Sequence, residues 1–234
     1  MTGHPRVAHT GEARAVRIRA GQVWLDGDLV APPDAAGLVI FAHGSGSSRF
    51  SHRNRAVAAV LQLGGFATLL LDLLTPEEEA IDVQTREYRF DIDRLAGRVT
   101  AAVDWAAGDA RVCDLPVACF GASTGAAAAL IAAARRPDRV RAVVSRGGRP
   151  DLAGAALPVV ASPTLLVVGG NDEEVIALNQ VAMREMRAPV TLEIVPGATH
   201  LFEEPGTLEE VSRLATEWCR RYLRDRTRAA APAP

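Results

Sequence analysis

The chain has 234 residues, 48% of them hydrophobic, a formal net charge of −2 and an isoelectric point of about 6.2. This length and composition suit one domain with a sizeable buried core. The near-neutral charge gives no reason to expect a nucleic acid or an anionic membrane as a partner. The three cysteines, Cys113, Cys119 and Cys219, do not form the even set of a disulfide framework. No pair of them has zinc-ligand spacing.

Both ends of the chain look unstructured. Residues 1–11 are polar, residues 227–234 are rich in Arg, Ala and Pro, and we predict a disordered tail at each end. A single domain over 12–226 is expected between them. The first twenty residues lack the apolar stretch of a secretory signal, and no apolar run is long enough to span a bilayer. We therefore expect a cytoplasmic protein with no membrane partner, and we leave its oligomeric state open.

Apolar runs and helical spacing alternate along the chain. Short apolar runs predict eight strands, at Ala15–Arg19, Val23–Val30, Gly37–Ala42, Ala67–Leu74, Pro116–Phe120, Val140–Ser145, Thr164–Val168 and Thr191–Val195. Helices are predicted at Asn54–Leu63, Phe90–Ala107, Thr124–Arg136 and Glu173–Met186, with a last one that carries Leu208, Val211, Leu214, Trp218 and Tyr222 on one face. Asp26-Gly27 is interpreted as the turn of a hairpin between the first two strands.

This alternation predicts an α/β fold, with a mostly parallel twisted sheet of about eight strands and helices on both faces. No large cap domain is expected. The segment from Leu73 to Arg89 is the longest candidate for a flap, and a solvated acidic loop is the alternative.

A strand, a sharp turn and a helix meet at Gly121-Ala122-Ser123-Thr124-Gly125. This context predicts a nucleophile elbow, in which the serine takes a strained positive φ and glycines two residues away on either side remove clashes. The turn also leaves the Thr124 N–H free at a helix N-terminus, where negative charge is favoured. The alternative is an ordinary Gly/Ser turn.

Chemically useful side chains follow several strands at the edge where parallel strands end. They come in the order Ser123, Asp172, His200, which suits a serine nucleophile, a histidine base and an acid that orients the base. Two alternatives stay open, namely that Asp172 only caps the next helix and that His200 is an idle loop residue. Asp72 is a competing acid, ranked lower because it precedes the nucleophile in the chain.

The loop His43-Gly44-Ser45-Gly46-Ser47-Ser48 follows another strand and supplies a second backbone donor for an oxyanion hole. We assign that role to the N–H of Ser45, paired with that of Thr124. A plain connector is the alternative, and a phosphate loop is disfavoured because the Gly-Lys-[Ser/Thr] ending is absent. His43 is interpreted as an internal brace, and His52 as a surface or capping residue.

Arginines cluster near the same edge. Arg146 and Arg149 follow one strand, and Arg49, Arg53 and Arg55 follow the oxyanion loop. A guanidinium fits a carboxylate well, so any of the five could bind a substrate carboxylate, and Arg146 and Arg149 are the named candidates for substrate binding. Surface salt bridges are the alternative.

Together these motifs resemble an α/β-hydrolase, and most nearly the dienelactone-hydrolase-like branch of small members without a lid. The resemblance rests on His43-Gly44-Ser45-Gly46, Gly121–Gly125, Gly170–Val175 and Gly197–His200, and it spans about Ala15 to Leu223. Similar domains also occur attached to phosphoribosyltransferase-like domains. True dienelactone hydrolases use a cysteine nucleophile, and this chain has Ser123 at that position.

The predicted function is a serine hydrolase that cleaves small carboxylic esters through an acyl-enzyme, with no cofactor and no metal. A lactone, dienelactone or thioester hydrolase acting on an acidic substrate is the near alternative. A non-catalytic α/β-hydrolase-like binding module is the alternative from another class.

Overall fold

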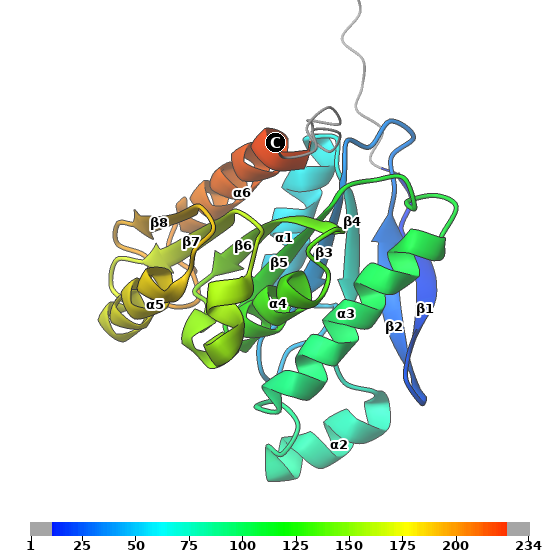
Figure 1. The fold of residues 1–234 in the computed structure, drawn as a ribbon, viewed down its shortest axis with the longest axis horizontal. Helices are drawn as coiled ribbons and strands as arrows, with labels where there is room; N and C mark the ends of the chain where they lie inside the picture. Colours follow the sequence, from blue (N-terminus) through cyan, green and yellow to red (C-terminus); the bar gives the residue numbers. More distant parts are fainter. Residues whose placement is uncertain (1–10, 224–234) are drawn as a thin grey trace, which may run out of the picture.

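A computed structural model describes residues 11–223 of the chain. Eight strands form one sheet in the order β1-β2-β4-β3-β5-β6-β7-β8 (Figure 1). The strands are β1 (Arg14–Ala20), β2 (Val23–Val30), β3 (Leu38–Ala42), β4 (Ala67–Leu71), β5 (Val117–Ala122), β6 (Val140–Arg146), β7 (Thr164–Gly169) and β8 (Val190–Val195). The pairs β1–β2 and β2–β4 are antiparallel and all other pairs are parallel, as the alternation of strands and helices predicts.

Helices cover both faces of the sheet (Figure 1). They are α1 (His52–Leu63), α2 (Pro76–Thr85), α3 (Ile92–Gly108), α4 (Thr124–Arg135), the 3₁₀ segment η1 (Pro150–Val159), α5 (Glu173–Glu185) and α6 (Thr207–Leu223). Two apolar clusters lie between the sheet and the helices on its two faces. One joins the sheet to α3 and α4 through Val99 and Leu130, and the other joins it to α1 and α6 through Leu61 and Trp218. The predicted α/β-hydrolase fold is confirmed.

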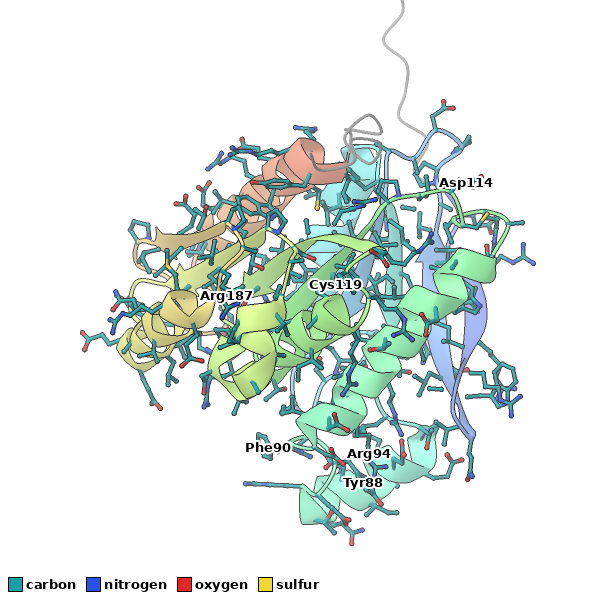
Figure 2. The ribbon with its side chains drawn as sticks, viewed as in Figure 1. Tyr88, Phe90, Arg94, Asp114, Cys119 and Arg187 are labelled. Carbon is teal, nitrogen blue, oxygen red and sulfur yellow. The ribbon has the colours of Figure 1, made fainter. Side chains whose placement is uncertain are left out.

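The central strands are buried along their whole length. Every residue of β3, β4, β5 and β7 is buried, which is the reason that these segments read as continuous apolar runs. Cys119 lies inside this layer (Figure 2). Each predicted strand and helix is present, with ends that differ by up to three residues. For example, α1 begins at His52 because Ser51 caps it, accepting a hydrogen bond from the Asn54 N–H at 3.3 Å.

The predicted position of the turn between β1 and β2 is wrong. Ala20 pairs with Val23, so the turn is Gly21-Gln22, and Gly21 has a φ of +65°. Asp26-Gly27 lies inside β2 instead. Gly27 sits between two neighbouring strands, where a Cβ atom would lie 3.2 Å from the Val16 side chain of β1 and 3.2 Å from the Leu69 side chain and the Leu70 carbonyl oxygen of β4. Its glycine therefore reflects close packing within the sheet rather than a turn.

The segment between β4 and α3 contains a helix, α2, rather than a solvated loop. Thr75 and Glu78 form a capping box at its start. Glu78 accepts two hydrogen bonds of 2.5 Å from Arg98 of α3. Tyr88 and Arg94 lie together where the chain passes to α3, with the guanidinium carbon 4.4 Å from the ring centroid (Figure 2). Glu78 thus anchors α2 onto α3.

The 3₁₀ segment η1 was not predicted, because its sequence, PDLAGAALPV, mixes Pro and Gly without helical periodicity and kinks at Gly154. The predicted tails lie outside the described residues, apart from Gly11. Within the described part, no helix is long and apolar enough to cross a membrane.

Candidate active site

Ser123 lies at the apex of a strained turn between β5 and α4. Its φ is +51° and its ψ is −123°, a conformation that an L-residue rarely adopts. A Cβ atom on Gly121 would lie 2.4 Å from the Ala126 Cα, and one on Gly125 would lie 2.3 Å from the Ala42 carbonyl oxygen. Neither position accommodates a side chain, so these two glycines are the residues that permit the turn.

Asp172 and His200, the predicted acid and base, come together from the ends of β7 and β8. The Asp172 Oδ2 lies 2.6 Å from the His200 Nδ1. Asp172 stands at the N-cap of α5 but makes no side-chain hydrogen bond to that helix. Its carboxylate is therefore directed to the histidine ring, and the capping alternative does not describe its contact.

The loops that carry Asp172 and His200 are joined through their backbones. The Asn171 N–H donates to the Ala198 carbonyl at 2.9 Å, and a Cβ atom on Gly169 would lie 2.4 Å from that same oxygen. Glu204 closes the second loop, because its carboxylate accepts hydrogen bonds from the Thr199 N–H at 3.1 Å and the Thr199 hydroxyl at 2.6 Å. These contacts fix the position from which His200 projects.

Asp72, the competing acid, and Glu203, a carboxylate near His200 in the sequence, have other partners. Asp72 accepts hydrogen bonds from the backbone N–H of Arg49, at 2.7 Å, and from its guanidinium. Glu203 accepts one of 2.8 Å from Arg53. Among the described residues, Asp172 is thus the one carboxylate hydrogen-bonded to His200.

Ser123 and His200 line a common cavity of about 220 Å³. Its other lining residues come from the oxyanion loop, the start of α1 and the ends of β5, β6 and β8: Gly44, Ser45, Ser47, Ser51, Arg53, Asn54, Ala122, Arg146 and Leu201. No hydrogen bond joins the Ser123 hydroxyl to the His200 ring among the contacts of the described residues. Such catalytic contacts are often long in a protein without substrate.

The loop of Ser45 packs directly against the elbow. A Cβ atom on Gly44 would lie 3.1 Å from the Ser123 Cβ. The Ser45 hydroxyl donates to the Arg89 carbonyl at 3.1 Å and lies 3.0 Å from the Thr124 hydroxyl. The side chains of Ser45 and Thr124 thus both take part in hydrogen bonds. The N–H of Thr124, at the first position of α4, has no acceptor within its own helix.

His43 braces this loop from inside. Its Nε2 accepts a hydrogen bond from the Leu73 N–H at 2.9 Å, and its Nδ1 donates to the Gly44 carbonyl at 2.9 Å. Burial lowers the pKa of His43, so the ring is neutral at physiological pH. The predicted role as an internal brace is confirmed.

The five arginines differ in their partners. Arg149 forms a two-bond pair with Asp151, at 2.8 and 2.9 Å, and does not line the cavity of Ser123. Arg49, Arg53 and Arg55 also bind carboxylates. Arg146 is 8% exposed, lines the cavity, and has two nitrogens, Nε and Nη1, that are buried without a hydrogen-bond partner. Burial, and then the nearby charge of Arg53, lower its pKa to about 10.

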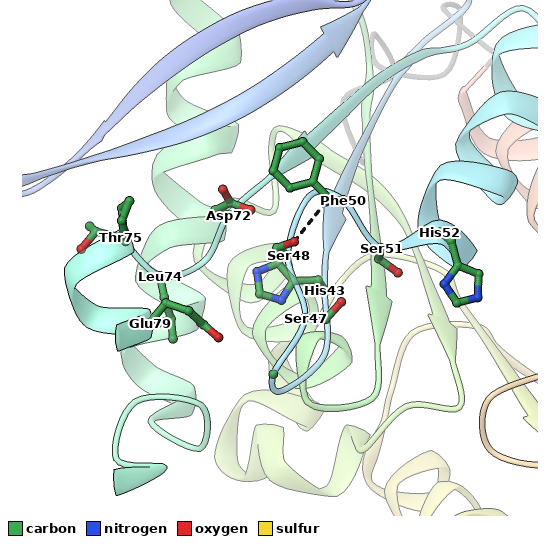
Figure 3. Close-up of a pocket in the computed structure, with 12 residues that line it drawn as sticks. His43, Ser47, Ser48, Phe50, Ser51, His52, Asp72, Leu74, Thr75 and Glu79 are labelled. Carbon is green, nitrogen blue, oxygen red and sulfur yellow. Dashed lines mark hydrogen bonds between the residues drawn. The ribbon is translucent and has the colours of Figure 1, made fainter. Parts of the chain in front are cut away.

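A second cavity of about 450 Å³ adjoins the first and shares Ser47 and Ser51 with it. In Figure 3, Leu74, Thr75 and Glu79 at the start of α2 face His43, Ser47 and Ser48 of the oxyanion loop across this space. Sequence reasoning did not identify this cavity. Helix α2 forms one of its walls, and that helix was not predicted.

No set of three or more His, Cys, Asp and Glu side chains in residues 11–223 could hold a metal ion. Cys113, Cys119 and Cys219 are all free thiols. Burial raises the pKa of Cys119 and of Cys219 to about 12, so both remain protonated and unreactive at neutral pH.

Comparisons with known proteins agree with this architecture. The model of the dienelactone hydrolase family matches residues 25–223. A crystal structure of a dienelactone hydrolase from Anabaena variabilis is 57% identical, with a TM-score of 0.91 over 92% of this chain and 100% of that one. Est1E from Butyrivibrio proteoclasticus is 19% identical, with a TM-score of 0.73 over 88% of this chain and 98% of its own, a likeness of fold.

Two curated relatives, from the CDC 1551 and H37Rv strains of Mycobacterium tuberculosis, are each 57% identical over 203 residues. Both carry the name "Putative phosphoribosyl transferase". The match covers 87% of this chain and 45% of each relative, so the chain spans about half their length. By its family model, its fold and its 57% identity to a solved relative of similar extent, the chain belongs to the dienelactone hydrolase family.

Proposed function

We propose that the protein is a serine hydrolase that cleaves small carboxylic esters through an acyl-enzyme intermediate. The observation that carries this proposal is the cavity shared by Ser123, at a strained apex, and His200, whose other ring nitrogen is bonded to Asp172 at 2.6 Å. A serine hydroxyl is a poor nucleophile unless a base removes its proton, and this arrangement provides one.

Each residue has a distinct role in the proposed reaction. Ser123 attacks the ester carbonyl while His200, through Nε2, takes the hydroxyl proton and passes it to the departing alcohol. Asp172 accepts the Nδ1–H of His200, which keeps Nε2 free to accept the proton, and it stabilises the imidazolium that forms. A water molecule activated by the same histidine then releases the acyl group from Ser123.

The N–H groups of Ser45 and Thr124 are proposed to bind the oxyanion. Their hydroxyls lie 3.0 Å apart, so the two backbone segments meet beside the nucleophile. A donor at a helix N-terminus also adds the favourable end of the helix dipole. Removing one such donor typically lowers kcat by roughly 10²- to 10³-fold.

The nature of the site favours small substrates. The cavity beside Ser123 is about 220 Å³, and the short helix α2 is the main element inserted near it. Arg146 is the proposed substrate-binding arginine, because it lines the cavity and has no carboxylate partner among the described residues. An acidic ester, lactone or thioester is therefore the second candidate substrate class. A cytoplasmic location stays a prediction from the sequence.

Labelling with a fluorophosphonate, followed by peptide mass spectrometry, tests the nucleophile. We expect one adduct, on Ser123, and a loss of esterase kcat of about 10⁴-fold or more in Ser123→Ala, because triad residues act as a unit. The fold should be unchanged, since the substitution removes one hydroxyl at the cavity wall. An unlabelled protein without activity on any ester would favour the non-catalytic binding module instead.

A panel of p-nitrophenyl esters with increasing acyl length, measured beside a dienelactone, would define the substrate. Preference for the dienelactone would identify the lactone alternative. Preference for short neutral esters would identify a plain esterase. The phosphoribosyl transferase name belongs to relatives of about twice this chain's extent, and we transfer no activity from it.

A further inference from the structure

The cavity between helix α2 and the oxyanion loop, called the α2 cavity below, lies next to the cavity of Ser123. It has a volume of about 450 Å³, and Ser47 and Ser51 line both cavities. The cavity of Ser123 is the smaller of the two, at about 220 Å³. The α2 cavity is therefore the adjacent space for any part of a substrate that the first cavity does not hold. The side chains on its wall decide which chemical groups bind there.

Two carboxylates, those of Asp72 and Glu79, line the α2 cavity, and no lysine or arginine of the described chain does. Asp72 is already neutralised, because its carboxylate accepts hydrogen bonds from the backbone N–H of Arg49, at 2.7 Å, and from the Arg49 guanidinium. Glu79 takes part in no ion pair among the described residues. It is therefore the carboxylate that gives this wall an uncompensated negative charge.

Two other carboxylates of α2 hold the helix in place, and they do so without Glu79. Glu78 accepts a hydrogen bond of 2.5 Å from Arg98 of α3. Asp82 accepts one of 2.6 Å from the Nε of Arg89, in the segment that leads to α3. Both arginines are thus engaged by carboxylates other than Glu79. These contacts fix α2 against the protein and leave the Glu79 carboxylate available to a ligand.

The surroundings of Glu79 oppose its negative charge. In Figure 3 its side chain extends from α2 toward His43 and Ser47 of the oxyanion loop, across the cavity. A carboxylate in the first turn of a helix is ordinarily favoured by the helix dipole. The pKa of Glu79 is nevertheless raised, first by partial burial and then by the negative charge of Asp82, with the charge of Arg89 as a smaller opposing effect. A cation in the cavity would relieve this repulsion.

We propose that the α2 cavity binds a positively charged part of the substrate and that Glu79 is the residue that selects this charge. The proposal rests on the proposed esterase function, of which it specifies the substrate class: an ester with an ammonium group on its alcohol or acyl part. Leu74 and Pro76 also line the cavity and can pack against the alkyl groups of such a cation. Arg146 lines the other cavity and has no part in this selection.

Choline and 3,3-dimethylbutan-1-ol have nearly the same shape and differ by one positive charge. Each is titrated as an inhibitor of the hydrolysis of p-nitrophenyl acetate, a neutral ester. Choline should inhibit the wild-type protein more strongly than the neutral alcohol does, and added salt should reduce this preference. Glu79→Gln should lower the preference by roughly two- to fivefold, the range of a partly exposed ion pair. Glu77→Gln, an exposed neighbour on α2 that does not line the cavity, is the matched control and should keep the wild-type preference.

The outcomes distinguish the cation subsite from the catalytic proposal. If choline inhibits the wild-type protein no better than the neutral alcohol, there is no cation subsite. If Glu79→Gln keeps the preference, or Glu77→Gln lowers it equally, Glu79 does not select the charge. Thermal unfolding of each variant shows whether the fold is intact. If the protein neither hydrolyses esters nor reacts with a fluorophosphonate, the proposed function fails separately, and calorimetric titration of the same two ligands into the wild type and Glu79→Gln still tests the subsite.

Discussion

Replacing Arg146 by Met should stabilise the protein while weakening its binding of acidic ligands. Arg146 is 8% exposed and has no carboxylate partner in the described chain. Methionine keeps much of the unbranched hydrocarbon stem but removes the charge. A buried charge that lowers stability is expected at a position where the same charge serves to bind a ligand.

The size of the effect follows from the pKa of Arg146. Burial lowers this pKa from its ordinary value to about 10. Each pKa unit corresponds to about 1.4 kcal/mol, so the buried charge costs roughly 3 kcal/mol of folding free energy. The cost is fully present below the folded-state pKa and is relieved only as the pH rises through about 10. At neutral pH all of it opposes folding.

Urea unfolding at neutral pH measures this cost directly. We expect Arg146→Met to raise the free energy of unfolding by up to about 3 kcal/mol, or Tm by roughly 6–12 °C for a domain of this size. Arg149→Met is the matched control, because that arginine is paired with Asp151 and its loss should bring no gain. A variant less stable than the wild type would refute the conclusion that the Arg146 charge is uncompensated.

Four further substitutions test other parts of the structure. Asp172→Asn should reduce kcat by roughly 10⁴-fold with the fold retained, because the histidine tautomer is no longer fixed; near-normal turnover would assign the acid elsewhere. Since burial lowers the pKa of His43, the unfolded chain binds more protons on acidification, so stability should fall below about pH 6.5. His43→Gln should flatten this dependence in unfolding experiments. Gly125→Ala should abolish activity or folding, since its Cβ would meet the Ala42 oxygen at 2.3 Å, whereas Gly97→Ala, with open space, should stabilise by about 0.5–1 kcal/mol.

The sequence predicts the sheet well because its central strands are buried along their whole length and stand out as apolar runs. The roles of Gly121 and Gly125 could also be predicted from the sequence, because a serine with a positive φ at the turn requires small residues two positions before and after it. The helix α2 was also predictable. Thr75-Pro76-Glu77-Glu78 has the pattern of a capping box with Pro at the first turn. The same acidic residues are also typical of a solvated loop, which is the alternative that the sequence analysis gave for this segment.

Other features depend on contacts between distant parts of the chain. The turn at Gly21-Gln22 carries a weaker local signal than Asp26-Gly27, and only the pairing of Gly27 with β1 and β4 explains why the latter is not a turn. The arginines near the site look alike in sequence. Arg149 pairs with Asp151, only two residues along the chain, whereas the fold buries Arg146 with no carboxylate partner among the described residues.

The two halves of the candidate triad are held in different ways, and this indicates how the contact between Ser123 and His200 forms. The elbow is closely packed at Gly121 and Gly125, where neighbouring backbone atoms leave no room for a side chain. The His200 loop is held at its outer side by the exposed hydrogen bonds between Thr199 and Glu204, which open more readily than buried contacts. We therefore expect the loop of His200, rather than the turn at Ser123, to adjust when a substrate brings the two side chains into hydrogen-bond contact.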